Sequence, residues 1–432
     1  MHGSLETVEY YDQGTISDVP FWQKYRAQVP IIIAVTAALQ YGFAVYGQGL
    51  PPESDLVVYS VIIALGANTG GLLWYRRMRL YPGTWRLSFL LPTMAMSWAV
   101  SLAGLTIFRI PYSVSLLSIG LASAMTLALI ASVWIRKPKS QEFSVISSPR
   151  VDAALAELPD LPYNICRTAD DILNSDAPVV ADLHTQLPSD WEAAIVQATL
   201  QGRSVYHIKQ ISESLTGRVQ IDHLSENALG TLAPDQSYTF LKAIAERTAA
   251  AALLVFLAPL FVLAAIAIRL DSPGPAIFRQ TRIGLGGRPF TIFKMRTMTY
   301  NEGPSTLEVD MTKENDPRIT RLGSFLRKSR IDEIPQLINI ARGEMSFIGP
   351  RPETVNLSSW YAETIDFYAY RHVVLPGISG WAQVKQGHVT STDDVLRKLQ
   401  YDLYYIKNFS FWLDIVIIMK PFKIMILKLG AK

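Results

Sequence analysis

The sequence predicts a membrane protein with three parts: a four-helix transmembrane bundle, a small cytosolic α/β module, and a C-terminal α/β domain with a re-entrant membrane helix broken at Pro259. Two observations predict this class. The 432 residues are 49% hydrophobic and only 18% charged, which is too apolar for an ordinary soluble protein. The apolar residues also gather in five long segments, with polar strand and helix patterns between the fourth and fifth segments and after the fifth.

The first four apolar segments are each close to the ~20 residues that a helix needs to span a bilayer. They cover roughly residues 29–46, 56–75, 87–108 and 114–135, and with a polar N-terminal tail they form a predicted first domain, residues 1–139. Basic residues lie before the first segment, between the second and third, and after the fourth, whereas the other two connections carry only Arg109. The positive-inside rule therefore places both ends of this domain, and the chain after it, in the cytosol.

Residues 140–237 form the predicted cytosolic module. Apolar runs at 177–185 and 203–210 flank a helical pattern at 191–201, which is the strand, helix, strand order of a small α/β unit. No glycine-rich nucleotide fingerprint occurs there. Single histidines on short elements are usually structural, so a regulatory or oligomerising role is favoured over metal binding by His184, His207 and His223.

Charge and cysteine content exclude two further classes. A net charge of +3, without interleaved aromatic and basic residues, does not indicate a partner nucleic acid. The single cysteine, Cys166, excludes an internal disulfide and a cysteine-cluster metal site, which fits a reducing compartment.

The fifth apolar segment, about residues 248–270, has Pro259 at its middle and basic residues on both flanks. Proline removes a backbone donor and bends a helix. One interpretation is a kinked transmembrane span. The positive-inside rule favours a helix that enters the inner leaflet, breaks at Pro259 and returns, which would hold the predicted C-terminal domain, residues 238–432, against the membrane.

Residues 273–298 read as two strands around a glycine turn, and alternation in "FTIFKMRT" places Lys294 and Arg296 on one face. Two such cations can form a solvated edge, or they can bind a diphosphate, for which arginine offers a bidentate fork and lysine a point charge. A further basic run, residues 316–330, leads directly to two adjacent carboxylates, Asp332 and Glu333.

The carboxylate pair precedes Pro335 and a helical apolar pattern that runs up to Gly343. One interpretation is that Asp332 caps this helix and Glu333 complements its dipole. The other is phosphate chemistry. Adjacent side chains on a helix point about 100° apart, so one carboxylate would face a phosphorus atom while its neighbour holds Mg²⁺. The spacing permits both interpretations.

From about residue 242 to the end, the chain resembles the bacterial sugar transferase family, the monotopic phosphoglycosyl transferases. The resemblance lies in the ordered blocks "RTAAAALLVFLAPL", "FKMRTM", "RIDEIPQL", "GEMSFIGPRPE", "PGISGWAQV" and "YDLYYIKNFSFWLDI". The preceding helices and module resemble the long form of the family by architecture. The resemblance implies transfer of a sugar 1-phosphate from a UDP-sugar to undecaprenyl phosphate at the bacterial inner membrane, releasing UMP and starting exopolysaccharide, capsule or O-antigen assembly.

The resemblance also implies residue roles. Asp332 would be the nucleophile that forms a phosphosugar adduct, and Glu333 would ligate Mg²⁺. Lys294, Arg327 and Arg351 match basic family positions near the substrate phosphates, and the strand alternation adds Arg296 to this substrate-binding set. Pro259 matches the helix-breaking proline, although Ala258 replaces the usual serine before it. Where the family has an asparagine, glycine and arginine run, this chain has "KQGH". Either Lys385 or His388 could supply the missing cation, or the contacts to the acceptor and the sugar could differ from those of the family.

The alternative function is a catalytically silent membrane scaffold of a polysaccharide assembly machine. It would keep the membrane parts but would not need Asp332, Glu333, Lys294 and Arg351 together. The expected partners of the enzyme are a UDP-sugar, undecaprenyl phosphate and membrane lipid, with a homodimer and later glycosyltransferases left open. The apolar residues and lysines of residues 411–432 favour an interfacial helix.

Overall fold

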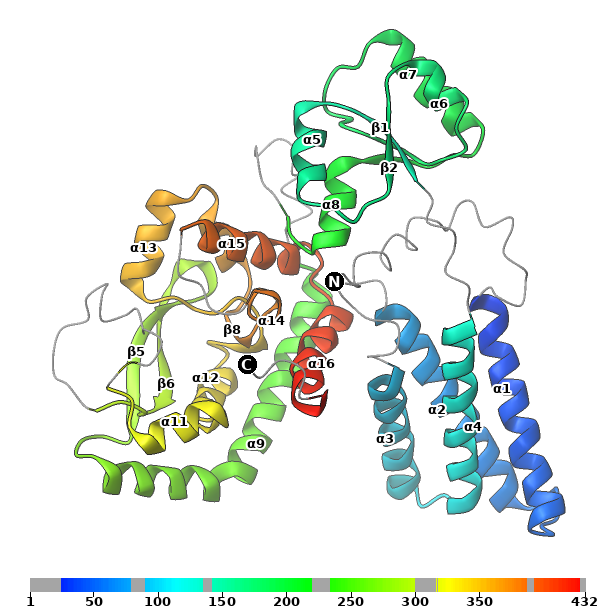
Figure 1. The fold of residues 1–432 in the computed structure, drawn as a ribbon. Helices are drawn as coiled ribbons and strands as arrows, with labels where there is room; N and C mark the ends of the chain where they lie inside the picture. The colour runs from blue at the N-terminus through cyan, green and yellow to red at the C-terminus, as the bar shows by residue number, and fades with distance from the viewer. Residues whose placement is uncertain are drawn as a thin grey trace. The chain divides into compact units, whose positions relative to one another are not determined.

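The computed structural model describes residues 25–78, 90–134, 142–219, 234–299, 316, 318–386 and 392–427. The chain divides into two compact units, Met1–Gly217 and Arg218–Lys432. Figure 1 shows the elements of each unit, and each is described by itself.

The first unit begins with apolar helices that lie close to the four predicted segments. They are α1 Tyr25–Gly42, which continues into a π-helical turn, Phe43–Gly47, then α2 Asp55–Met78, α3 Leu90–Phe108 and α4 Val114–Trp134. Each forms part of a helix long and apolar enough to cross a membrane. Asn68 of α2 donates to the Gly120 carbonyl at 3.2 Å and accepts from the Trp98 indole at 2.9 Å. Because buried polar groups between apolar helices need partners, these bonds tie α2 to α3 and α4.

The rest of the first unit is an α/β sheet of parallel strands in the order β2-β1-β3-β4. The strands are β1 Phe143–Ile146, β2 Tyr163–Cys166, β3 Val179–Ala181 and β4 Val205–His207. The helices are α5 Pro149–Ala156, α6 Ala169–Leu173, α7 Ser189–Leu200 and α8 Ile208–Thr216. Successive residues of β3 enter different hydrophobic clusters, Val180 with α5 and α8, Val179 with α6 and α7, so helices cover both faces (Figure 1). The expected strand, helix, strand order is confirmed, and β1 and β2 are strands that the sequence did not predict.

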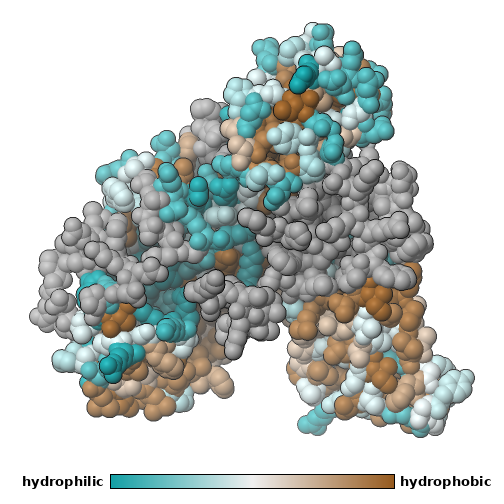
Figure 2. All heavy atoms as spheres, in the orientation of Figure 1, coloured by the Kyte–Doolittle hydropathy of each residue, from teal (hydrophilic) through white to brown (hydrophobic). Residues whose placement is uncertain are grey.

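The second unit begins with α9, Gln236–Asp271, a helix of 36 residues that contains Pro259. It is long and apolar enough to cross a membrane, and Figure 1 shows it sharply bent. Much of its apolar surface is uncovered by protein, since Val255 and Phe256 are each 78% exposed. Figure 2 shows hydrophobic residues gathered over the bent part of α9. These apolar helices, with those of the first unit, mark the chain as a membrane protein.

The predicted hairpin is confirmed as β5 Ile277–Ile283 and β6 Pro289–Met295, paired antiparallel around Gly286 and Gly287, whose φ angles are 64° and 74°. The remaining helices are α11 Arg321–Lys328, α12 Gln336–Arg342, α13 Val355–Thr364, α14 Trp381–Lys385, α15 Thr392–Lys407 and α16 Phe411–Leu427. A parallel pair, β7 Ser346–Ile348 and β8 Gly377–Ser379, completes the α/β region.

Both arms of α9 support this α/β region. Before Pro259, Ala250 packs with Ile292 of β6 and Ile340 of α12. After Pro259, Ile268 packs with Leu326 of α11. The arm before Pro259 therefore supports the hairpin and α12, and the arm after it supports α11 and Met295 at the end of the hairpin.

Helix α12 begins too far after Asp332 for that residue to cap it. Pro335 occupies the N-cap position of α12, and Asp332 and Glu333 lie in a separate 3₁₀ turn, Ile331–Glu333. The helix-capping interpretation of Asp332 is therefore wrong. The predicted end of the helix is confirmed at Gly343, whose φ of 76° suits a glycine.

Candidate active site

The 3₁₀ turn Ile331–Glu333 carries both carboxylates. It follows Arg330, whose backbone adopts a left-handed φ of 58°. Such a conformation is uncommon for residues other than glycine and often accompanies functional turns. The turn separates the end of α11 from the start of α12 and presents adjacent side chains in different directions.

Asp332 has an unsatisfied carboxylate. Its Oδ1 atom is buried and has no hydrogen-bond partner within the described part of the chain. Burial, followed by the nearby charge of Glu333, raises the pKa of Asp332, whereas Lys294, Arg327 and Arg330 oppose the rise. A buried acceptor without a donor is costly, so this oxygen is available to a ligand or reactant.

Glu333 lies in a different environment although it is the next residue. It is 7% exposed, and its Oε1 atom lies 3.1 Å from Arg330 Nη1 and 3.4 Å from Arg351 Nη2. Two guanidinium groups therefore balance its charge. Among the described residues, Glu333 is thus a paired carboxylate, whereas Asp332 keeps one oxygen without a partner.

Lys294 of β6 contributes a cation to the same place. Burial, then repulsion by Arg351 and Arg282, lowers its pKa to about 7, and Glu333 and Asp332 limit the fall. Its amine makes no hydrogen bond to any residue that the structure describes. An ammonium held without a bonded partner can accept an anionic ligand.

Arg327 reaches the site because α11 packs closely against the end of β6. A Cβ atom on Gly323 would lie 2.0 Å from the Thr297 carbonyl oxygen, so only glycine permits this approach. Arg327 Nε then donates to Thr297 Oγ1 at 2.8 Å. From there its charge acts on Asp332 and opposes the rise in the pKa of that carboxyl.

Arg296 does not join these residues. Strand β6 ends at Met295, so the alternation that placed Lys294 and Arg296 on one face stops one residue too early. The Arg296 guanidinium donates to the carbonyl oxygens of Pro273 at 2.8 Å and Ser272 at 2.6 Å. It therefore closes the C-terminal end of α9, and the expectation that it shares a phosphate-binding face with Lys294 is corrected.

Of the two alternative cations in the "KQGH" stretch, the structure describes Lys385 but not His388. Lys385 lies over the Trp381 ring, with Nζ 4.9 Å from the ring centroid, and burial lowers its pKa to about 8. It makes no contact with the carboxylate pair among the described residues. His388 lies outside the described residues.

Sequence reasoning missed two arginines of the site. Arg330 binds Glu333, and Arg282 of β5 lies close enough to Lys294 to lower its pKa. The spacing of three residues between Arg330 and Glu333 is a detectable signal for the first. No local pattern identifies Arg282, because the hairpin and its neighbours bring it to the site.

The module contains a second polar cluster, which unites two of the three considered histidines with Asp182. His207 Nε2 lies 2.7 Å from His184 Nδ1 and 3.2 Å from Asp182 Oδ1, and His207 Nδ1 accepts from the Lys209 amide at 3.0 Å. Because Nδ1 accepts, neutral His207 carries its proton on Nε2 and has no free lone pair there. This arrangement favours a structural role over metal ligation. His223 lies outside the described residues.

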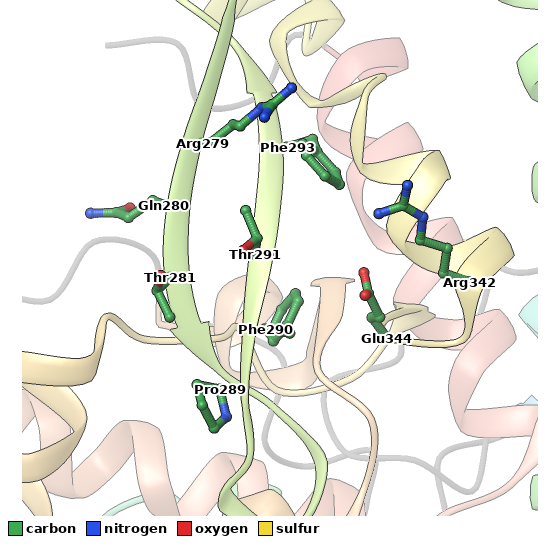
Figure 3. A pocket seen from close by; sticks show the side chains of 9 residues that line it. All are labelled: Arg279, Gln280, Thr281, Pro289, Phe290, Thr291, Phe293, Arg342 and Glu344. Carbon is green, nitrogen blue, oxygen red and sulfur yellow. The ribbon is translucent and has the colours of Figure 1, made fainter.

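An open pocket of about 650 Å³ lies beside the hairpin. Figure 3 shows Arg279, Phe293 and Arg342 at one end, with the guanidinium carbons of the two arginines 5.8 and 5.4 Å from the ring centroid. None of the sequence-predicted site residues lines this pocket. The carboxylate site is therefore a separate feature.

Together the fold and site define a membrane-bound α/β protein that gathers two carboxylates and several cations, a combination suited to substrates that contain phosphate. The model of the family "Bacterial sugar transferase" matches residues 237–428, which contain every predicted site residue. This match, together with 38% identity over 85% of the length of the first relative described below, shows that the chain belongs to this family and is an enzyme.

Named relatives of the chain support this assignment. The chain is 38% identical over 372 residues to the UDP-N-acetylgalactosamine-undecaprenyl-phosphate N-acetylgalactosaminephosphotransferase of Aeromonas hydrophila, covering 84% of this chain and 85% of that protein. It is 41% identical over 213 residues to a UDP-glucose:undecaprenyl-phosphate glucose-1-phosphate transferase of Xanthomonas campestris pv. campestris, covering 49% of this chain and 43% of the relative. A transferase with the same name from Caulobacter vibrioides is 44% identical over 182 residues, covering 41% and 67%.

Proposed function

We propose that this enzyme transfers a sugar 1-phosphate from a UDP-sugar to undecaprenyl phosphate. The observation that carries the proposal is the buried, unpaired Oδ1 atom of Asp332 among Glu333 and a group of cations. The names of the relatives support this substrate pair. The product, an undecaprenyl diphosphate sugar, would start the assembly of an exopolysaccharide, capsule or O-antigen.

Asp332 performs the first displacement. Its carboxylate oxygen attacks the β-phosphorus of the UDP-sugar, and the bond from that phosphorus to the bridging oxygen breaks, so UMP leaves with the electron pair. The sugar phosphate is then esterified to Asp332 as an acyl phosphate. Removing this oxygen from water without giving it a hydrogen bond makes it a better nucleophile than a solvated carboxylate.

Undecaprenyl phosphate performs the second displacement. One of its phosphate oxygens attacks the same phosphorus, the bond to Asp332 breaks, and the carboxylate is regenerated. Neither step needs a base to remove a proton from the nucleophile, because both nucleophiles are anions. The demands on the protein are therefore position and charge stabilisation.

The cations supply that stabilisation. Lys294 and Arg327 oppose the rise in the Asp332 pKa, so they lie where they can also attract the phosphoryl oxygens. Arg351 offers a guanidinium on the Glu333 side of the site. Arg330 pairs with Glu333 and keeps that carboxylate in place.

The carboxylates also fit Mg²⁺. The available donors are oxygens alone, and Mg²⁺ is commonly held by one or two carboxylates together with substrate phosphates. Glu333 would hold the ion, and Asp332 Oδ1 would stay free to act as the nucleophile. The bound ion would neutralise part of the diphosphate charge.

The membrane arrangement is also part of the proposal. Helices α1–α4 form a transmembrane bundle, and α9 enters and leaves the inner leaflet of the bacterial inner membrane with its bend at Pro259. The exposed apolar residues of α9, with both arms packed against the α/β region, support a helix that does not cross. The active site then faces the cytosol at the level where both a nucleotide sugar and a lipid phosphate can reach it.

The decisive experiment is UMP release by detergent-solubilised protein with undecaprenyl phosphate and Mg²⁺. The donors are UDP-N-acetylgalactosamine and UDP-glucose, which the relatives' names contain, within a wider panel of UDP-sugars. Without the acceptor, donor labelled in the sugar should leave a covalent label on a peptide containing Asp332. Release with one donor and labelling of that peptide support the proposal. Silence with every donor in folded protein would favour the scaffold function.

A further inference from the structure

The "GPRPE" segment, residues 349–353, is held mainly through its carbonyl groups. Its two prolines have no N–H to donate, so few donors are available for fixing the chain. Gly377 N donates to Pro350 O at 2.9 Å, Arg282 Nη1 donates to Pro352 O at 2.7 Å, and Ile283 N donates to Glu353 O at 3.0 Å. A further anchor, on the Arg351 carbonyl, comes from a side chain elsewhere in the fold.

That side chain is Arg371, in the 3₁₀ helix Tyr368–Val373. It is 3% exposed, and its Nη2 donates to Arg351 O at 2.8 Å while forming an ion pair with Asp402 at 2.9 Å. Its Nη1 donates to the Tyr368 hydroxyl at 2.6 Å. The planar guanidinium thus holds three partners at once, which a lysine ammonium on a flexible stem cannot reproduce.

Charge balance accounts for part of this arrangement. Asp402 is a buried carboxylate and Glu353 a mostly buried one, and Lys398 and Arg371 are the cations beside them. The bond to the Arg351 carbonyl is additional, because it neutralises no charge. It fixes the backbone of the one residue in the segment whose side chain reaches Glu333, at 3.4 Å.

We infer that Arg371 is a positioning residue for Arg351: it fixes the Arg351 backbone so that the Arg351 guanidinium meets Glu333 and the diphosphate of the donor. Arg371 itself touches no substrate. This role rests on the proposed function, since the group that Arg351 binds is the UDP-sugar diphosphate. Loss of the anchor should weaken donor binding and transition-state stabilisation only as far as Arg351 supplies them.

A double-mutant cycle tests this dependence. The variants are Arg371→Lys, Arg351→Ala and the double variant, measured by UMP release across donor concentrations. In protein that keeps the native Arg351, Arg371→Lys should lower kcat/KM about tenfold, equivalent to about 1.4 kcal/mol. The loss should come chiefly from a higher KM for the donor. In the Arg351→Ala background the same change should have an effect of less than about twofold. Additive effects, or no effect of Arg351→Ala alone, would overturn the inference.

A milder variant covers the case in which Arg371→Lys does not fold. Tyr368→Phe keeps the ring and removes only the hydroxyl that accepts from Arg371 Nη1. It should lower kcat/KM in the same direction by a smaller factor, and that loss should also disappear with Arg351→Ala. A loss that persists in both backgrounds would contradict positioning through Arg351.

A readout without catalysis separates this inference from the proposed function. Hydrogen–deuterium exchange of peptides that include residues 349–353 should be faster in Arg371→Lys than in the native protein. The matched control is Arg203→Lys in the module, another buried arginine that binds carbonyls, here those of Ala177 at 2.7 Å and Ile172 at 2.5 Å. It should leave these peptides and UMP release unchanged. If native protein releases no UMP, the proposed function fails, while unchanged exchange in Arg371→Lys would refute the anchor itself.

Discussion

Two buried clusters of carboxylates and bases, one around Asp182 in the module and one around Asp332, differ in how completely their hydrogen bonds are made. In the module, Asp182 accepts from the His184 amide at 3.2 Å and the Thr185 hydroxyl at 2.8 Å, and both nitrogens of His207 have partners. In the second unit, Asp332 Oδ1 has no partner among the described residues. Folding stability favours the first arrangement, so the second indicates a group reserved for a ligand or reactant.

The largest effect expected from this comparison is that of Asp332→Asn. The amide is a poor nucleophile, so UMP release should fall by about four orders of magnitude or more. The melting temperature should stay equal or rise, because burial and Glu333 already disfavour the ionised carboxylate of Asp332. Activity and thermal unfolding are measured on the same preparation. A variant that loses stability in proportion to activity would show that Asp332 is a structural residue.

The next effect concerns pH. The pKa of Lys294 is lowered to about 7, so the lysine loses its charge as pH rises through that value. The kcat/KM for the UDP-sugar should then fall about tenfold for each unit above it, since this ratio reports groups of the free enzyme. In Lys294→Arg the group stays charged, and this alkaline fall should be absent. An identical alkaline limb in both proteins would assign the titration to another group.

The smallest expected effect on activity is that of Asp182→Asn in the module. The substitution replaces one carboxylate oxygen by an amide NH₂ group, which then faces a hydrogen-bond donor and cannot accept from it. The lost bond costs about 1–3 kcal/mol of local stability. Hydrogen exchange of β3 and β4 peptides should quicken, while UMP release should not change. A clear loss of transferase activity would mean that the module cluster also serves the reaction.

Local patterns were sufficient for several parts of the site. The adjacency of Asp332 and Glu333 predicts different environments, and the structure pairs one carboxylate and leaves the other unpaired. Pro259 predicts a bend in its apolar segment, and helix α9 is bent. Each of these properties depends on neighbours in the sequence.

Other assignments needed the folded chain. Arg296 and Lys294 are two residues apart, yet one binds carbonyls at the end of α9 and the other lies by the carboxylates. The strand ends between them, and strand ends depend on pairing with distant residues. In the same way, Arg371 lies 20 residues from Arg351 in sequence and holds its carbonyl. No spacing rule links them.

The sequence by itself determined the apolar helices, the glycine turn of the hairpin, the end of α12 at Gly343 and the presence of the acidic pair. These features follow from hydrophobic length, backbone freedom and residue type, which are properties of short segments. Only the tertiary structure decided that Glu333 is the paired carboxylate, that Arg351 lies beside it and that Arg371 holds the Arg351 carbonyl. Those outcomes depend on burial and on distances such as 3.4 Å between Arg351 and Glu333 and 2.9 Å between Arg371 and Asp402, which are remote in sequence. Desolvation there makes each missing or completed hydrogen bond count.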